Sequence, residues 1–348
     1  MVATAAQHIS ALQHRYRDEV QAALHSAMAC SDSGFFSLLR YHLGWEEADG
    51  KPANIATGKG LRPILCLTAC EVAGGNWQDA LPAAAALELV HNFSLIHDDI
   101  QDRDTRRWGR PTLWTVHGEA KAIAAGNAMR VIADHTLMTL VRSGMPTALV
   151  SDVAFELTGR YLEMIEGQYM DMSFEALDDV TVEQYLDMVG RKTGALIESA
   201  MYMGALVATS DREQASGFGA CGRQLGLAFQ IRDDYLGIWG DPAATGKAVG
   251  ADIRRKKKSM PMVHLFEHAA DTDRAWLDKA YAQDGEIGGE DVEQILELLD
   301  QLETPTHVQA AAVAEANGAM ETVDSLGLTG SARETVQAMA EFFVTREK

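Results

Sequence analysis

The sequence contains few cysteines, few prolines and no long apolar run. Its cysteines show no metal-binding spacing, and we interpret them as small thiols in a reducing compartment: Cys30, Cys66, Cys70 and Cys221. No stretch of about 18 apolar residues is present, and the N-terminal segment lacks the charged leader and apolar core of a signal peptide. These absences predict a soluble, cytoplasmic protein without stable membrane insertion.

The sequence is also short of positive charge. Asp and Glu number 50 and Lys and Arg only 30, which gives a formal net charge of -20. Because nucleic-acid binding needs a basic surface, this balance excludes a typical nucleic-acid partner. With only 8 prolines, abundant alanine and 47% hydrophobic residues, the composition is typical of an all-α protein. No linker or repeat divides the chain, so we expect residues 1–348 to form one domain, a large helical bundle around a central cavity.

One stretch, LVHNFSLIHDDIQDRD at residues 89–104, combines an apolar helical pattern with an acidic face. At helical spacing His91, Asp98 and Asp102 share a narrow arc, and a third carboxylate, that of Asp99, lies beside it. Carboxylates this close repel one another and lose hydration when buried, so a cation must bind them. Asp98 and Asp102 can bind a divalent ion from the same side, and oxygen ligands favour Mg²⁺.

A second stretch, FQIRDDYLGIWGD at residues 229–241, repeats this pattern. The pair Asp233 and Asp234 again follows an apolar helical run, and we expect one helix face to carry Gln230, Asp233 and Asp241. Two acidic helices that face each other across a cavity would hold several Mg²⁺ ions around a polyphosphate.

Basic residues accompany both stretches. In GKGLRP, Lys59 and Arg62 stand at the start of an expected helix, where cations oppose the helix dipole unless they share an anion with the free amides. The loop RDTRRWGRPTLW places several arginines directly behind the first aspartates, although a salt-bridged loop would have the same composition. Lys192, in GRKTGAL, must reach solvent or an anion from an apolar helix. The glycine-rich, basic residues 240–258 are typical of a flap that closes over phosphates.

Taken together, these motifs indicate a family. GKGLRP, DDIQD, GQYMD, KTGAL, FQIRDD and GKAVGAD stand in the order and approximate spacing found in the trans-isoprenyl diphosphate synthases, or polyprenyl synthetases. The sequence resembles that family over nearly its whole length. The resemblance implies the all-α isoprenoid synthase fold, a homodimer, about three Mg²⁺ ions per site, and head-to-tail trans condensation of isopentenyl diphosphate with an allylic diphosphate.

The resemblance also implies roles for single residues. The positions that bind isopentenyl diphosphate correspond to Lys59, Arg62 and His91. The magnesium ligands correspond to Asp98, Asp102 and Asp233. Asp99 supports the first ligands, and Asp234 is expected in the water shell of the last ion. The cations that grip the allylic diphosphate correspond to Arg107, Lys192 and Lys257, or to Lys256 or Lys258 if the loop shifts by one residue. Polar groups that face the allylic cation correspond to Thr193 and Gln230, and the same cavity is lined by Gln168 and Asp171.

Three positions depart from the family pattern. Gly237 stands where a third aspartate is usual and Gly60 where an arginine is common. Trp108 stands where a second arginine is usual, unless Arg106 and Arg107 take the two arginine positions by a shift of one residue. The changes predict a weaker grip on the last metal ion and on isopentenyl diphosphate. Phe93, five residues before Asp98, stands where short-chain members place an aromatic side chain that blocks the product tunnel. We therefore expect a C15 or C20 product, with C20 favoured over C15.

Two other functions are compatible with parts of the sequence. A class I terpene cyclase also uses two acidic helices, and Asp233, Gly237 and Asp241 imitate the spacing of its second motif, but a cyclase needs no pocket for isopentenyl diphosphate. A regulatory subunit of a heteromeric synthase would explain Gly237 and Trp108. Such a subunit should also have lost the first aspartates, which are present here.

Overall fold

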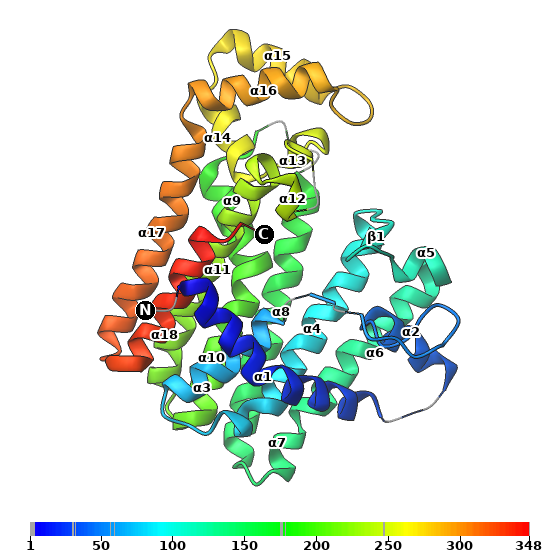
Figure 1. The fold of residues 1–348 in the computed structure, drawn as a ribbon, viewed down its shortest axis with the longest axis vertical. Coiled ribbons are helices and arrows are strands. Elements are labelled where there is room, and N and C mark those ends of the chain that lie inside the picture. The colour runs from blue at the N-terminus through cyan, green and yellow to red at the C-terminus, as the bar shows by residue number, and fades with distance from the viewer. Residues whose placement is uncertain are drawn as a thin grey trace. The chain divides into compact units, whose positions relative to one another are not determined.

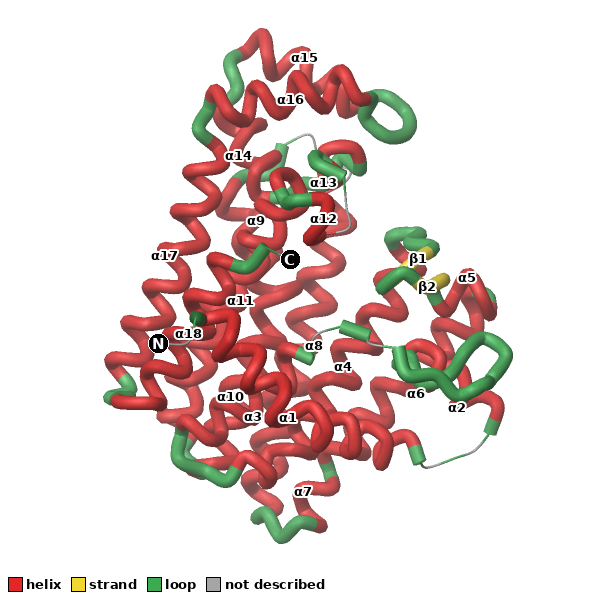
Figure 2. Tube along the Cα trace, viewed as in Figure 1, coloured by secondary structure: helices red, strands yellow, loops and turns green. Residues whose placement is uncertain are grey.

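The expected all-α fold is confirmed by the computed structural model, which describes residues 4–29, 31, 33–55, 57–58, 60–174, 177, 179–245 and 248–347. Helices make up nearly all of the regular structure, and in these ranges the strands form one small antiparallel hairpin, β1 (Arg106–Arg107) with β2 (Arg110–Pro111) (Figure 1, Figure 2). In the same ranges, no helix is both long and apolar enough to span a membrane.

The helices follow one another with short connections, and their bounds are α1 (Ala5–Met28), α2 (Gly34–His42), α3 (Leu61–Val72), α4 (Leu81–Gln101), α5 (Leu113–His117), α6 (Glu119–Leu137), α7 (Thr139–Arg142), α8 (Thr147–Phe174), α9 (Val182–Val189), α10 (Ala195–Thr209), α11 (Arg212–Trp239), α12 (Pro242–Thr245), α13 (Ala251–Arg254), α14 (Met260–His268), α15 (Asp271–Tyr281), α16 (Gly289–Gln301), α17 (Thr304–Ser325) and α18 (Gly330–Thr345). A 3-10 helix (Trp77–Ala80) precedes α4, and a π-helix (Gly190–Gly194) joins α9 to α10.

The chain forms two compact units, each built from separated segments. We name them after the acidic motif that each contains. The DDIQD unit consists of Ser10–Tyr161 and Ser199–Phe218, and the FQIRDD unit consists of Met1–Ile9, Leu162–Glu198 and Gly219–Lys348.

In the DDIQD unit, α4 is buried on almost every side except near its C-terminal end. Its first turns are rich in alanine, and Ala83, Ala84, Leu87 and Leu89 are fully buried. A helix that is apolar all round belongs inside the core, and small side chains let its neighbours approach closely. This packing leaves the polar C-terminal turns of α4 as the part that can meet a ligand.

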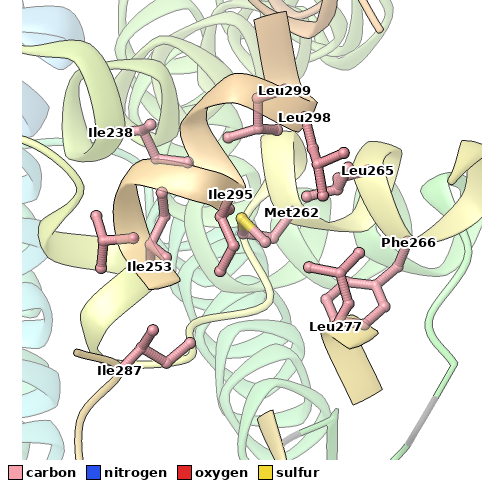
Figure 3. Packing of buried hydrophobic residues seen from close by; sticks show 11 residues of the cluster. Ile238, Ile253, Met262, Leu265, Phe266, Leu277, Ile287, Ile295, Leu298 and Leu299 are labelled. Atoms are coloured by element: carbon pink, nitrogen blue, oxygen red, sulfur yellow. The ribbon is translucent and has the colours of Figure 1, made fainter. Parts of the chain in front are cut away.

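In the FQIRDD unit, a hydrophobic cluster fixes the end of α11 against α13, α14 and α16 (Figure 3). Ile238 near the end of α11 and Ile253 of α13 are both fully buried in it. Ile238 directly follows Gly237, and Ile253 directly follows Asp252. The packing of the two isoleucines therefore also fixes the positions of Gly237 and Asp252. The prediction that Asp241 shares a helix face with Gln230 and Asp233 is wrong, because α11 ends at Trp239.

Candidate active site

In the DDIQD unit, two of the predicted diphosphate-binding residues meet between α3 and α4. Arg62 Nη1 lies 3.1 Å from His91 Nε2, and Arg62 Nε is buried without a hydrogen-bond partner. Burial and the positive charge of Arg62 hold the pKa of His91 well below its usual value, so the imidazole is neutral. An unpartnered guanidinium donor suits an anionic ligand. Lys59, the third predicted residue, lies outside the described residues.

The first acidic motif stands at the C-terminal end of α4. The helix ends at Gln101, and Asp102 is its C-cap. The last backbone carbonyls of a helix concentrate partial negative charge there, so added carboxylates are disfavoured until a cation binds. Asp98 is partly exposed and Asp102 is exposed, whereas Asp99 is buried. The two accessible carboxylates are therefore the pair that the helical spacing predicted.

Asp99 forms an ion pair with Arg107. Arg107 Nε donates to Asp99 Oδ1 over 2.6 Å, while Asp99 Oδ2 is buried without a partner. Burial raises the pKa of Asp99 to about 6, although the charge of Arg107 opposes the shift. Arg107 comes from β1, whose two turn residues, Trp108 and Gly109, have φ values of 50° and 76°. Positive φ at both positions is what a tight two-residue hairpin requires, and this hairpin holds Arg107 at the end of α4.

The donor set of this motif fits magnesium. Among the described residues, no three His, Cys, Asp or Glu side chains converge closely enough to hold an ion by themselves. Mg²⁺ commonly takes only one or two carboxylates and completes its shell with waters and phosphate oxygens. Asp98 and Asp102 would supply those carboxylates, and Arg107, which is paired with the neighbouring Asp99, would meet the phosphate.

In the FQIRDD unit, Asp234 is a buried hydrogen-bond hub that is only 1% exposed. Its Oδ1 accepts from Gln230 Nε2 (3.0 Å) and Lys257 Nζ (3.2 Å). Its Oδ2 accepts from Tyr185 Oη (2.5 Å) and the backbone N–H of Met260 (2.9 Å). Asp234 was expected in the water shell of a metal ion, but both of its oxygens are already hydrogen-bonded to protein donors. Asp234 instead orients Lys257 and the start of α14.

Asp233 has a different environment. Its side chain is 46% exposed, and its Oδ1 accepts a hydrogen bond from Arg346 Nη2 over 2.8 Å. Arg346 follows α18 and is buried, where it also donates to the carbonyl of Phe229 (3.2 Å) and lies 4.0 Å above the Phe229 ring. The exposed carboxylate is a candidate magnesium ligand whose orientation Arg346 fixes.

The missing aspartate at Gly237 has a structural counterpart. A Cβ at Gly237 would overlap the carboxylate of Asp252 and lie 2.6 Å from its Cγ. Asp252 is buried on α13, and its Oδ2 lies 3.7 Å from Lys257 Nζ. Burial alone would lower the pKa of Lys257, but the charges of Asp234 and Asp252 raise it. A carboxylate from α13 thus stands one helical turn from Asp233, beside the position where the motif lacks its third aspartate.

The KTGAL motif lies on the π-helix, a one-turn irregularity that often marks a functional site. Its glycines permit close packing, because a Cβ at either Gly190 or Gly194 would approach Arg223 to 3.1 Å. The backbone of Lys192 similarly packs against Gly167 of α8. A side chain at Gly167 would displace the motif, because its Cβ would overlap the backbone nitrogen of Lys192.

The polar side chains of this motif are all engaged. Lys192 Nζ is ion-paired with Asp171 of α8. Thr193 Oγ1 donates to Gln230 Oε1 over 2.9 Å, and Gln230 Nε2 continues the chain to Asp234. The structure therefore connects Thr193, Gln230, Asp234 and Lys257 by hydrogen bonds, while Lys192 and Asp171 form a separate ion pair. Gln168, also predicted to line the cavity, is buried on α8.

Phe93 lies on α4, as the helical spacing predicted, and is 8% exposed. Its ring meets that of His97 edge-on, with centroids 4.9 Å apart. His97 in turn packs on Gly126 of α6, where a Cβ would overlap the imidazole. Gly126 thus leaves the space that His97 occupies, and His97 supports the ring of Phe93.

The comparison with known proteins can now be set beside this geometry. A model of the polyprenyl synthetase family matches residues 51–299. The chain belongs to the polyprenyl synthetase family. A (2E,6E)-farnesyl diphosphate synthase of Mycobacterium tuberculosis is 36% identical over 314 residues, which cover 89% of this chain and 86% of that protein. A geranylgeranyl diphosphate synthase of the same organism is 40% identical over 254 residues, or 73% of this chain and 71% of that protein.

The structure of this family member also resembles solved ones. A polyprenyl synthetase from Streptomyces coelicolor A3(2) shares 35% sequence identity and gives a TM-score of 0.89, with 96% of this chain and 99% of that chain covered. The family and the isoprenoid synthase fold that the motifs indicated are therefore confirmed.

Three residues of the candidate site in this polyprenyl synthetase were missed by the sequence analysis. Tyr185 and Arg346 lie outside every motif, and only the fold brings them to Asp234 and Asp233. Asp252 is the last residue of GKAVGAD, so the motif marked the segment but not the contact with Gly237.

Proposed function

We propose that this protein is a Mg²⁺-dependent trans-prenyltransferase that condenses isopentenyl diphosphate with an allylic diphosphate to give a short-chain prenyl diphosphate. The observation that carries the proposal is the Arg62–His91 pair, with its unpartnered Nε, in a unit that also holds Asp98 and Asp102. A pair of metal-binding carboxylates serves one diphosphate, and a separate buried guanidinium serves another.

The cations in both units already have acidic partners, and this suggests how substrate binds. Arg107 is paired with Asp99, Lys192 with Asp171, and Lys257 with Asp234. In the absence of substrate, each positive charge is therefore stabilised by a carboxylate of the protein. When substrate binds, the same side chain can turn to the phosphate oxygens. We expect Arg107, Lys192 and Lys257 to hold the allylic diphosphate.

Magnesium would neutralise the diphosphate as it leaves and so favour cleavage of the allylic carbon–oxygen bond. The chain's own contribution is to orient the substrate and exclude water. Arg62 and His91 hold isopentenyl diphosphate, and the chain of hydrogen bonds from Thr193 to Gln230 presents polar oxygens that stabilise an allylic cation. Because water would quench that cation, we expect residues 240–258 to close over the substrates.

The two alternatives are less well supported. A cyclase-like second motif would need Asp233, Gly237 and Asp241 on one helix, but Asp241 lies beyond the end of α11. A regulatory subunit would explain Gly237 and Trp108, but the first aspartates are present and Asp252 places a carboxylate beside Gly237.

One assay separates these functions. Purified protein is incubated with Mg²⁺, isopentenyl diphosphate and each allylic starter, and the products are treated with phosphatase and identified. Linear prenyl alcohols support the proposal. Cyclic hydrocarbons from the allylic substrate alone would indicate the cyclase, and no product without a partner chain would indicate the subunit.

We propose a short product, with C20 favoured over C15, and Phe93 as the side chain that limits its length. Relatives named for both lengths are comparably similar, so they do not decide between C15 and C20. Phe93→Ala should lengthen the product by one or more C5 units, measured by chromatography of the dephosphorylated alcohols. A matched change away from this helix, Phe35→Ala, should leave the length as in the wild type, because Phe35 is exposed on α2. An unchanged product from Phe93→Ala would contradict the proposed role of Phe93.

We also propose that the protein acts as a homodimer. Helix α8 carries exposed apolar side chains at helical spacing, which a second copy would cover: Phe155, Leu162, Ile165 and Tyr169. Sedimentation equilibrium should give twice the mass of one chain, and Phe155→Asp should shift the equilibrium toward the monomer.

A further inference from the structure

Several buried polar atoms around Arg62 have no hydrogen-bond partner. Besides Arg62 Nε on α3, they are His42 Nε2 on α2 and, on α4, Asn92 Oδ1 and Glu88 Oε2. An unpaired buried polar atom costs about 1–3 kcal/mol, and native proteins contain few of them. Two of these atoms are nitrogens from separate helices, which an anion with several oxygens can satisfy, whereas the oxygens of Asn92 and Glu88 need a hydrogen-bond donor instead.

His42 belongs to the same neighbourhood as Arg62 and His91. The pKa of His91 is lowered first by burial and then by Arg62, Arg107 and His42, so all three groups are close enough to act on it. His42 itself is the last residue of α2 and is 7% exposed. Burial, followed by the charges of Arg107 and Arg110, lowers the pKa of His42 to about 3, while an interaction with the side chain of Asn92 raises it. The imidazole is therefore neutral at physiological pH and can donate one ring N–H.

Trp108 covers the outer side of this imidazole. The two ring centroids are 6.0 Å apart, with the planes tilted by 55°. A Cβ at Gly58 would lie 3.4 Å from Trp108 Cζ2, so the indole also rests on the loop that leads to α3. Trp108 has a φ of 50°, a conformation that is costly for a bulky residue and that persists only when the surroundings enforce it. The hairpin turn thus places an indole, and no cation, against His42.

We infer that His42 is an additional binding residue for the diphosphate held by Arg62 and His91, and that its ring N–H serves where other family members use arginines at positions 60 and 108. The inference rests on the proposed function, since it adds a residue to the isopentenyl diphosphate site. A neutral donor adds a hydrogen bond without adding a further positive charge beside Arg62 and Arg107. Trp108 keeps the imidazole in place and limits its access to water.

The test compares variants of His42 by two measurements. His42→Phe keeps a ring of similar size but removes the donor, and His42→Gln keeps a donor. A hydrogen bond to a charged group is worth about 1.5–3 kcal/mol, so His42→Phe should weaken binding of inorganic pyrophosphate by about 10-fold or more in metal-free calorimetry. The KM for isopentenyl diphosphate should rise by a similar factor, while the KM for the allylic substrate stays within about 2-fold and His42→Gln retains most of the affinity.

A matched control is available in the same unit. His25 stacks on Trp45, with ring centroids 3.7 Å apart, but it is exposed on α1. His25→Phe should bind pyrophosphate as the wild type does. Equal pyrophosphate affinity in His42→Phe and wild type would overturn the inference, as would a loss in His42→Gln as large as that in His42→Phe.

A second variant keeps the inference testable if His42→Phe does not fold. Trp108→Arg restores the arginine that is usual in the family and should bind pyrophosphate more tightly than the wild type. In that background His42→Leu, which lacks a donor, should weaken pyrophosphate binding less than the same change does in the wild type. Equal losses in the two backgrounds would contradict the view that His42 supplies the donor that the arginine would otherwise supply. If the wild type forms no prenyl product but binds pyrophosphate through His42, the proposed function fails and the anion site stands.

Discussion

The inner aspartates of the two acidic motifs differ in how completely they are bonded. Asp99 and Asp234 are both 1% exposed. Asp234 accepts hydrogen bonds from three side chains and one backbone N–H, whereas Asp99 accepts one from Arg107 and leaves its Oδ2 without a partner. The second aspartate of the Asp-Asp pair therefore has hydrogen bonds to both of its oxygens in the FQIRDD unit but to only one of them in the DDIQD unit. We expect the motif with the unbonded oxygen to depend more on its ligand.

The largest expected effect follows from the exposed carboxylates of the DDIQD unit. Asp98→Asn removes a proposed magnesium ligand, and metal stabilisation of a leaving group is worth several kcal/mol, so kcat should fall by about 1000-fold. The free energy of unfolding should change by less than about 0.5 kcal/mol, because the side chain is partly exposed. Steady-state kinetics and urea unfolding measure the two quantities. A large loss of stability together with activity would show that this motif is structural too.

The second prediction concerns stability in the FQIRDD unit. Asp234→Ala leaves the hydroxyl of Tyr185 buried without its acceptor and removes one of the two carboxylates beside Lys257, and removing a buried, hydrogen-bonded charge typically costs about 3–5 kcal/mol of unfolding free energy. Urea unfolding followed by circular dichroism measures the loss.

The control for Asp234 is an ion pair at the surface of the same unit. Asp278→Ala removes the exposed partner of Arg274 on α15 and should cost less than about 1 kcal/mol. Comparable losses in the two variants would contradict the view of Asp234 as a hub.

The third prediction tests the contact between Gly237 and Asp252. Gly237→Ala should destabilise the protein by about 1–3 kcal/mol, because the added methyl group overlaps a buried carboxylate. Gly159→Ala on α8 is the matched helical change, since nothing lies within 4 Å of the added Cβ. It should leave the protein equally stable or up to about 1 kcal/mol more stable, from helix propensity. Thermal unfolding of both variants should therefore shift in different directions, and a stabilised Gly237→Ala would contradict the packing.

The smallest expected effect is the pH dependence of stability that His264, a residue outside the acidic motifs, contributes. Burial, with lesser contributions from His307 and His268, lowers the pKa of His264 to about 4. The unfolded chain binds this proton more readily, so its contribution to stability is complete above the ordinary pKa and is lost as pH falls toward 4. Between pH 7 and pH 5 the wild type should lose about 1–2 kcal/mol more unfolding free energy than His264→Gln. Identical pH profiles in urea unfolding would contradict the assignment.

Much of the fold and of the candidate site was predictable because its chemistry is local. The placement of Asp98 and Asp102 on one helix face and the helical setting of Lys192 follow from residue spacing alone. Asp241 was wrongly placed on the helix face because the helical spacing from Asp233 was extended past Gly240, where α11 has already ended.

Contacts between distant segments could not be derived in this way. Arg346 lies 113 residues from Asp233, and no local pattern marks it as a partner. The counterpart of the missing aspartate at Gly237 likewise comes from a separate helix, α13. Such pairs depend on tertiary packing, here on a core that buries Ile238 and Ile253 together.

The most direct test of the account is a crystal grown with Mn²⁺ in place of Mg²⁺ and with inorganic pyrophosphate. Anomalous scattering locates the manganese ions without reference to activity. We predict ions bound to Asp98 and Asp102 in one unit and to Asp233 in the other, each also coordinated by pyrophosphate oxygens, and none on Asp234. Manganese on Asp234, or none at either motif, would contradict the claim that the exposed aspartates bind metal while the buried one maintains the fold.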